Sequence, residues 1–198
     1  MKVGGWMGAA LLASEGWRAP LARAQGGTLT RVALDLNTER DLQRVRGQWR
    51  VATGLVPGEP NEGLVAGIDG SPARLPDYDD SAWELCEDIQ ERRSSGFTFA
   101  WWRTAVTLPE EADGVRFAGA QVFFETNADN YGEIWVDGER PQGGEILGHN
   151  ADQRVMISGS AIPGTRYVIA CLAINGPLAA PRGAVFLRYA TLAFEFVS

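Results

Sequence analysis

The sequence is poor in the residues that bind transition metals. It holds a single histidine, His149, and two cysteines, Cys86 and Cys171, with no Cys-x-x-Cys pair. A zinc ion in a protein usually needs three or four His, Cys or carboxylate ligands. The sequence therefore excludes a zinc site of the usual ligand types, and we expect neither a resident metal nor a cofactor.

Both cysteines lie in apolar, strand-like runs. This placement predicts buried free thiols, because an unpaired cysteine behaves as a small hydrophobic residue. A disulfide between Cys86 and Cys171 is the alternative if the protein is exported to an oxidising compartment.

Positive charge is also scarce. The 198 residues include 18 Lys and Arg against 25 Asp and Glu, which gives a net charge of −7. Binding to a nucleic-acid backbone requires a basic footprint, so nucleic acid is excluded as a partner. No apolar run approaches the roughly 20 residues that a membrane-spanning helix needs. The length fits one globular domain.

The first 27 residues have the layout of a secretory signal. An apolar stretch from Val3 to Ala13 follows Met1-Lys2, and Ala22-Arg23-Ala24 has the form of a cleavage site. The charged residues between these two elements are unusual, so a disordered leader or a misassigned start is the alternative. We expect export to the periplasm or the extracellular space, with the cytoplasm as the alternative. We assign residues 28–198 to a single domain.

The rest of the chain lacks any alternation of strands with long amphipathic helices, which excludes a parallel α/β sheet. Short β-like segments are instead separated by Gly, Pro, Asn and Asp, and one helical turn is expected over Thr38–Val45. This pattern predicts an all-β fold, an antiparallel β-sandwich or jelly roll. The expected strands are Thr30–Leu36, Gly47–Ala52, Trp83–Glu87, Thr98–Leu108, Ala120–Thr126, Tyr131–Val136, Arg154–Ser158, Arg166–Ala173 and Ala184–Phe196.

The run Asp77-Tyr78-Asp79-Asp80-Ser81-Ala82-Trp83 has two interpretations. Clustered carboxylates could bind calcium, which takes several oxygen ligands. Asp and Ser ahead of a strand also close turns by accepting hydrogen bonds from nearby backbone amides. We favour the turn, with Trp83 entering the core, and regard a structural calcium as the less favoured reading.

Trp101-Trp102-Arg103 lies in a predicted strand, so the two indoles must point to opposite faces. One hypothesis places one indole in the core and the other, beside Arg103, on the surface as a platform for a sugar ring. The other hypothesis makes both tryptophans structural, one under each layer. The sequence does not separate them.

Carboxylates recur every four residues at Glu125, Asp129, Glu133 and Asp137. Paired carboxylates can perform general acid–base catalysis, but they need a cleft and a defined separation. Exposed carboxylates on a strand are the commoner outcome. His149 lies in a loop with no nucleophile motif around it, so its sequence context gives little support for catalysis.

Several short elements together resemble a known module. They are Val45-Arg46-Gly47-Gln48-Trp49-Arg50, Tyr78-Asp79-Asp80-Ser81-Ala82-Trp83-Glu84, Arg92-Arg93-Ser94, Phe99-Ala100-Trp101-Trp102-Arg103, Phe124-Glu125-Thr126, Asp129 to Glu139, Gly148-His149-Asn150 to Arg154, and Ile174-Asn175-Gly176-Pro177. The combination resembles the N-terminal β-sandwich module of exported gluconolactonase/senescence-marker-protein-like proteins. More loosely, it is similar to the sugar-binding jelly roll of family 2 glycoside hydrolases.

This resemblance implies a galactose-binding-like fold and an accessory role in binding a saccharide or sugar lactone. It does not imply lactonase chemistry, because in that family the metal and the catalytic acids lie in a propeller, and this chain is too short to add one. The ligand residues expected from the matching motifs are Arg92, Trp102, Arg103, Asp129, Tyr131, Glu133, Asn150, Arg154 and Asn175.

Two other functions remain open. One is a small hydrolase or cyclase that works in a pocket near Trp102, Arg103 and Glu133, with Asp129 and Glu133 as the weak catalytic candidates. The other is a docking module that presents an apolar sheet face, such as Val122, Phe124, Ile134 and Val136, to a partner chain or to a second copy of itself.

Overall fold

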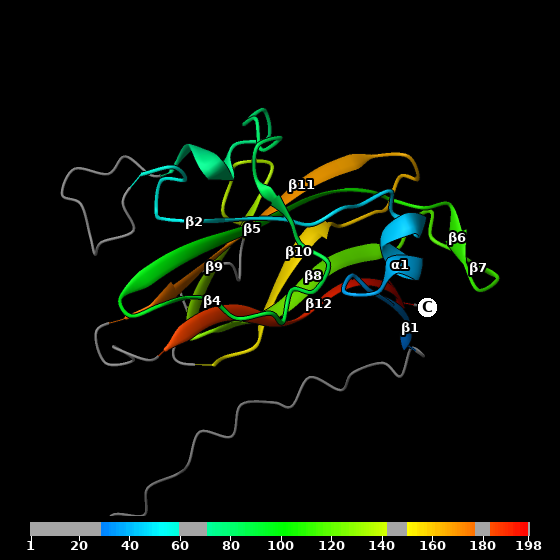
Figure 1. Ribbon diagram of the computed structural model, residues 1–198. Helices are drawn as coiled ribbons and strands as arrows, with labels where there is room; N and C mark the ends of the chain where they lie inside the picture. Colours follow the sequence, from blue (N-terminus) through cyan, green and yellow to red (C-terminus); the bar gives the residue numbers. More distant parts are fainter. Residues whose placement is uncertain (1–28, 60–70, 142–149, 177–182, 198) are drawn as a thin grey trace, which may run out of the picture.

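The structure, a computed structural model, describes residues 29–59, 71–141, 150–176 and 183–197. The expected leader, residues 1–27, lies outside these ranges, as does His149. Two antiparallel sheets stack face to face (Figure 1). The elements are β1 (Leu29–Asp35), α1 (Glu39–Arg44), β2 (Arg50–Thr53), the 3₁₀ turn η1 (Pro72–Arg74), β3 (Glu84–Leu85), β4 (Arg93–Ser95), β5 (Thr98–Thr107), β6 (Glu111–Ala112), β7 (Val115–Arg116), β8 (Gln121–Asp129), β9 (Tyr131–Val136), β10 (Gln153–Ser158), β11 (Arg166–Asn175) and β12 (Ala184–Val197).

One sheet, called here the lower sheet, has the strand order β1-β12-β8-β10, with β4 added to β12. The other, the upper sheet, has the order β3-β2-β5-β11-β9. Both are antiparallel, and the first strand of the sandwich pairs with the last. The all-β sandwich predicted from the sequence is therefore confirmed.

The main core fills the space between the two sheets. Along β8, Val122 and Phe124 are fully buried, and the ring of Phe124 lies 6.5 Å from that of Trp49. Phe117 and Phe194 stack at 3.8 Å between ring centroids. Burying a side chain of this size contributes about 1.5–3 kcal/mol. The prediction that these residues form an exposed apolar face for docking is wrong, because Val122, Phe124 and Ile134 are all buried inside this core.

Helix α1 begins where the sequence predicts it. The hydroxyl of Thr38 accepts a hydrogen bond from the Asp41 amide and so caps the first turn. Near the other end, Arg44 pairs with Asp113 in the turn between β6 and β7, at 2.7 Å. This ion pair holds α1 beside the β6–β7 hairpin at one end of the sandwich (Figure 1).

The two cysteines are buried and free, as predicted. Cys86 directly follows β3 and Cys171 lies in β11, and strands β2 and β5 separate them in the sheet. Three strand spacings amount to about 14 Å. A disulfide needs Cα atoms within about 7 Å, so these residues do not meet. Burial raises the pKa of both thiols.

Four charged side chains form a closed ring on the outer face of the lower sheet. Arg31 bonds both Glu125, at 2.6 Å, and Glu195, at 3.0 Å. Arg154 bonds the same two carboxylates, at 3.0 and 2.7 Å, and its guanidinium covers the ring of Phe123. Hydrogen bonding to Arg31 is the main cause that lowers the pKa of Glu125.

Replacing Glu125 by glutamine is expected to lower the free energy of unfolding by about 1 kcal/mol at neutral pH, a typical value for exposed charges in a network. A carboxyl whose folded-state pKa is depressed stabilises the fold above its unfolded pKa and loses that contribution as the pH falls through the folded value. The difference between wild type and variant should therefore shrink as the pH falls below 4.5, the ordinary value. Urea titrations of both proteins at several pH values would measure the difference in their free energies of unfolding. A difference that does not change with pH would contradict the ion-pair explanation.

Candidate functional site

The outer face of the upper sheet carries a second, smaller apolar core. Trp83, Phe99, Trp101 and Leu172 are buried there together. The segment 71–83 covers this face: η1 packs on β11, and the residues after it are bonded by Arg103 of β5 and Arg50 of β2 (Figure 1). Trp83 enters this core from the segment, as the sequence predicts.

Arg103 holds that segment to the sheet. Its side chain is only 3% exposed, and its Nε donates to Oδ2 of Asp80 at 2.7 Å. The two terminal nitrogens donate to the backbone carbonyls of Ala73, at 3.1 Å, Pro76, at 3.1 Å, and Tyr78, at 3.3 Å. A planar guanidinium can bind several acceptors at once, which an ammonium cannot match in one plane.

The turn that follows Tyr78 is closed by Asp79. Its Oδ1 accepts a hydrogen bond from the Ser81 amide at 3.0 Å, and this bond is the main cause that lowers the pKa of Asp79. Arg50 donates to the carbonyls of Ser81 and Trp83, at 3.1 Å each. Asp79 and Asp80 thus serve the turn and the ion pair with Arg103, which supports the turn interpretation.

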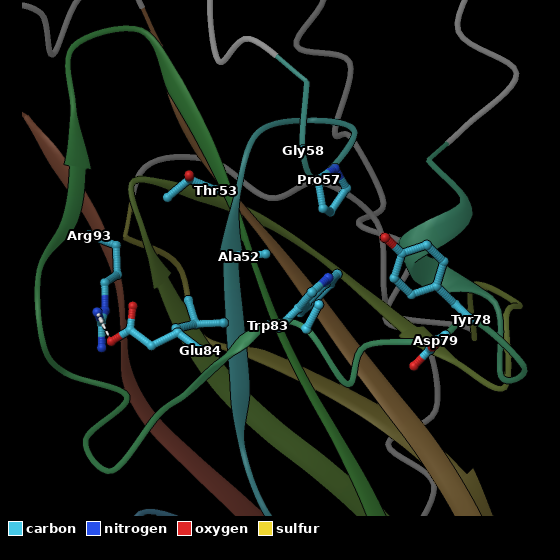
Figure 2. Close-up of a pocket in the computed structure, with 11 residues that line it drawn as sticks. Ala52, Thr53, Pro57, Gly58, Tyr78, Asp79, Trp83, Glu84 and Arg93 are labelled. Carbon is cyan, nitrogen blue, oxygen red and sulfur yellow. Dashed lines mark hydrogen bonds and ion pairs between the residues drawn. The ribbon is translucent and has the colours of Figure 1, made fainter.

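A groove of about 450 Å³ opens beside this turn, a size within the range of small-molecule sites. Figure 2 shows Tyr78 and Trp83 on one side of β2 and the paired Arg93 and Glu84 on the other, with Pro57 above Trp83. The lining residues come from three separate stretches: Val51, Ala52, Thr53, Pro57 and Gly58, then Tyr78, Asp79, Ala82, Trp83 and Glu84, and finally Arg93.

The groove combines an aromatic wall with polar ends. The rings of Tyr78 and Trp83 lie 5.5 Å apart with 58° between their planes. Tyr78 is half-buried and supplies most of this aromatic surface, whereas Trp83, which is 9% exposed, contributes a small part of it from the outer core. Glu84, whose side chain is 62% exposed, accepts a hydrogen bond from Nη1 of Arg93 at 2.7 Å. Stacking on an aromatic face together with a few polar groups is the usual composition of a saccharide site.

The platform role expected for Trp102 is wrong. Trp101 and Trp102 do point to opposite faces, but both indoles are buried, Trp101 in the outer core and Trp102 in the core between the sheets. Arg103 is also not a ligand residue, because its donors are used by the segment that it holds. Both tryptophans are therefore structural, which was the alternative hypothesis.

Three of the predicted residues, Asp129, Asn150 and Asn175, come together at one end of the sandwich. With Asn130 and Arg188, which were not predicted, they form what is called here the polar end. Arg188 donates to Asp129 at 2.6 Å and to the Asn150 side chain at 3.0 Å, and Asn130 donates to Asn175. Asn175 also donates to the Gly96 carbonyl and is fully buried, so its expected role in reading sugar hydroxyls is wrong.

The remaining predicted residues lie apart from one another. Tyr131 is next to the polar end, at the start of β9, and the exposed Arg92 lies over the Phe186 ring. Glu133 accepts a hydrogen bond from Trp135 and pairs with Arg140, at 3.5 Å. Arg154 belongs to the charged ring of the lower sheet. For Arg92, Asp129, Tyr131, Asn150, Glu133 and Arg154, contact with a ligand stays a prediction.

The pocket proposed for a hydrolase near Trp102, Arg103 and Glu133 is not formed by these residues. Trp102 points into the core between the sheets, whereas Glu133 lies on the outer face with its cross-strand neighbour Leu172. The carboxylates spaced by four residues have separate partners. Asp129 bonds Arg188 at the polar end, and Asp137 accepts the Val168 amide at 2.8 Å.

None of the nine residues predicted to bind a ligand lines the groove. The nearest signal in the sequence was the Asp77–Trp83 run, which carries Tyr78 and Trp83 on either side of the turn. The contribution of Pro57 and of Arg93 had no local signal, because the fold brings these stretches to Trp83 from distant positions.

A second hollow, of about 590 Å³, lies beside α1. Its aromatic member, Trp49, is 1% exposed and donates its indole N–H to the Leu36 carbonyl. Cys86 also borders it. This hollow offers no open aromatic face among the residues that the structure describes, so the groove beside Trp83 is the better candidate.

No protein-family model and no curated protein sequence matches the chain. In the part of the chain that the structure describes, no helix is long and apolar enough to cross a membrane. Similarity to known proteins therefore comes from solved structures.

The sandwich resembles segments of several glycosidase structures. A β-glucuronidase of Bacteroides uniformis superposes with a TM-score of 0.53 at 17% identity, over 83% of this chain and 18% of the enzyme. A β-glucuronidase of Faecalibacterium prausnitzii gives 0.51 at 14% identity, over 86% of this chain and 32% of the enzyme. A glycosyl hydrolase family 2 member of Bacteroides cellulosilyticus gives 0.51 at 13% identity, over 76% and 20%.

These values establish a shared fold. The chain spans a fifth to a third of the length of these enzymes. The likeness agrees with the looser of the two resemblances in the sequence, the jelly roll of family 2 glycoside hydrolases, while the association with gluconolactonases stays a prediction. The chain is thus a β-sandwich of the kind found as one segment of family 2 glycosidases.

Proposed function

We propose that the protein is a non-catalytic, saccharide-binding accessory module that holds its ligand in the groove beside Trp83. The observation that carries this proposal is the angled Tyr78–Trp83 wall with a carboxylate at each end of the groove. Pyranose rings stack their C–H faces on aromatic rings, and carboxylates accept hydrogen bonds from the hydroxyls at the ring edge. The fold shared with segments of glycosidases supports the same class of ligand.

Binding fits the groove better than catalysis does. A general acid at neutral pH needs a carboxyl whose pKa is raised by burial or by a like charge. The two carboxylates here are exposed, and hydrogen bonding to Ser81 lowers the pKa of Asp79. A shallow stacking site with few hydrogen bonds binds weakly, so we expect dissociation constants from roughly micromolar to millimolar.

Replacing Tyr78 by alanine is expected to weaken saccharide binding about five- to thirtyfold, because it removes the more exposed ring of the aromatic wall. Loss of one stacking ring costs roughly 1–2 kcal/mol, and about 1.4 kcal/mol is tenfold in affinity. Isothermal calorimetry or NMR titration with neutral monosaccharides and sugar lactones would measure it. The matched control is Tyr78→Phe, which keeps the ring and should keep the affinity within about threefold.

The same titrations decide between the groove and the polar end. Arg188→Gln removes the guanidinium that joins Asp129 to Asn150 and leaves the groove intact, so it should not change the affinity. If Arg188→Gln abolishes binding and Tyr78→Ala has no effect, the ligand binds at the polar end, as the sequence motifs suggested. If no saccharide binds to the wild-type chain, the proposed function is wrong.

An accessory module acts together with another protein or domain. Its fold occurs as a segment of larger enzymes, which supports a partner chain as the companion of this module. We also propose that the protein is exported and that it associates with a partner chain or with a second copy of itself. Co-purification from the native host, followed by light scattering of the isolated chain, would test the partner and the oligomeric state together.

A further inference from the structure

We propose that the groove selects neutral or cationic saccharides, such as hexoses and amino sugars, and disfavours sugars that carry a carboxylate. This inference rests on the proposed function and adds the charge class of the ligand. It follows from which charged groups in and around the groove are already paired and which are exposed to a ligand.

The exposed charges at the two ends of the groove are negative. Asp79 is exposed and stays ionised, since hydrogen bonds from Ser81 lower its pKa. Glu84 lies at the opposite end, and its side chain is 62% exposed. Both ends therefore present acceptors for hydroxyl or ammonium donors and would repel a carboxylate on the ligand.

The basic residue of the groove is committed to carboxylates. Arg93 donates from Nη1 to Glu84 and from Nη2 to Glu91, at 2.7 Å in both bonds. Its side chain is 13% exposed, and its Nε, which has no hydrogen-bond partner among the described residues, is buried and so does not face a ligand. A carboxylate on the sugar could pair with Arg93 only by displacing one of these glutamates. The lost ion pair would cancel most of the binding free energy gained from the new one.

The basic residues next to the groove are paired as well. Arg103 donates to Asp80, and Arg50 lies 3.7 Å from the same carboxylate while it donates to backbone carbonyls. Arg50, Arg93 and Arg103 thus each have an acidic partner, and Asp79 adds a negative charge beyond these pairs. The net charge of −7 on the chain acts in the same direction at long range.

The test compares glucose, glucosamine and glucuronate on the full chain by calorimetry. We expect glucuronate to bind at least fivefold more weakly than glucose, and glucosamine to bind as tightly as glucose or more tightly. Because exposed charges are screened by salt, the difference should narrow between roughly 0.05 and 0.5 M salt.

The variant Glu84→Gln sharpens the test. It removes one exposed negative charge and weakens the hold on Nη1 of Arg93. Glucose should lose some affinity, because Glu84 is a hydroxyl acceptor in the groove, and the ratio of glucuronate affinity to glucose affinity should rise severalfold. The control Glu87→Gln removes another exposed glutamate nearby in the sequence that does not line this groove. It should leave the ratio of the two affinities as in the wild type.

The outcomes separate the two proposals. If none of the three sugars binds, the proposed function is overturned and the selectivity falls with it. If glucose binds but glucuronate binds equally well or better, the charge selectivity alone is overturned and the saccharide site stands. If Glu84→Gln and Glu87→Gln change the ratio equally, the discrimination does not come from the groove, and this also overturns the inference.

Discussion

Replacing Arg103 by methionine should lower the free energy of unfolding by about 3 kcal/mol or more and should abolish saccharide binding. Removing one partner of a buried ion pair typically costs 3–5 kcal/mol, and the partial exposure of Asp80 moves the expectation to the lower end. The carbonyls of Ala73, Pro76 and Tyr78 lose their donor at the same time. Binding is lost because segment 71–83, which carries Tyr78 and Trp83, is no longer held on the sheet.

Urea denaturation and a saccharide titration measure the two effects. Methionine keeps the apolar stem of the side chain, so the loss reports the guanidinium and not its packing. The free energy of unfolding of Arg103→Lys should lie between those of the wild type and Arg103→Met, because an ammonium cannot reach the same set of acceptors. Asp80→Asn, which keeps an acceptor for Nε, is the milder control at about 1 kcal/mol. An Arg103→Met protein that unfolds at the wild-type urea concentration would show that Arg103 does not fasten the segment.

Trp102→Ala is the second substitution with a large expected effect, a loss of about 3–5 kcal/mol of stability. The indole is fully buried between the sheets, next to Val51 and Cys171 in the register of the upper sheet. Removing it leaves a cavity that the strands cannot close, because neighbouring strands are fixed by their ladders. Thermal or urea unfolding would measure the loss.

Comparing the Trp102→Ala and Tyr78→Ala variants also tests where the saccharide binds. Where the Trp102→Ala protein still folds, its affinity for saccharides should stay near the wild-type value, whereas Tyr78→Ala loses affinity with little loss of stability. Trp102→Phe, which leaves a smaller cavity, gives a folded control. A Trp102→Phe protein that keeps its stability and loses its ligand would return Trp102 to the binding site.

Most of the elements could be predicted because their signals are local. The alternation in Tyr131–Val136 and the turn residues Asp137-Gly138 after it match β9 and its turn, where both turn residues have positive φ. Thr38 begins α1 as a capping residue. The β6–β7 hairpin was missed, although Asp113-Gly114 between its strands is a tight-turn signal of the same kind. Its strands are two residues long, too short to show a period.

The orientation of β5 could not be predicted, and the error about Trp102 follows from this. Residues 98–104 are all buried, because one face of the strand packs in the main core and the other under segment 71–83. A strand covered on both sides shows no alternation of polar and apolar residues. The sequence therefore gave no sign that both Trp101 and Trp102 are internal, or that Arg103 is bonded within the protein.

The sequence by itself determined the all-β sandwich, the place of α1, the burial of both cysteines and the turn around Asp79, since each depends on residues close together in the chain. Only the tertiary structure decided which aromatic residues face solvent and which charges are paired. Pro57 follows β2 and Trp83 precedes β3, two neighbouring strands of the upper sheet, whereas Arg93 reaches them from β4, which pairs with β12 of the lower sheet. Arg103 fastens the covering segment. Long-range pairing of this kind is set by the packing of the whole sandwich, so no local stretch of residues encodes it.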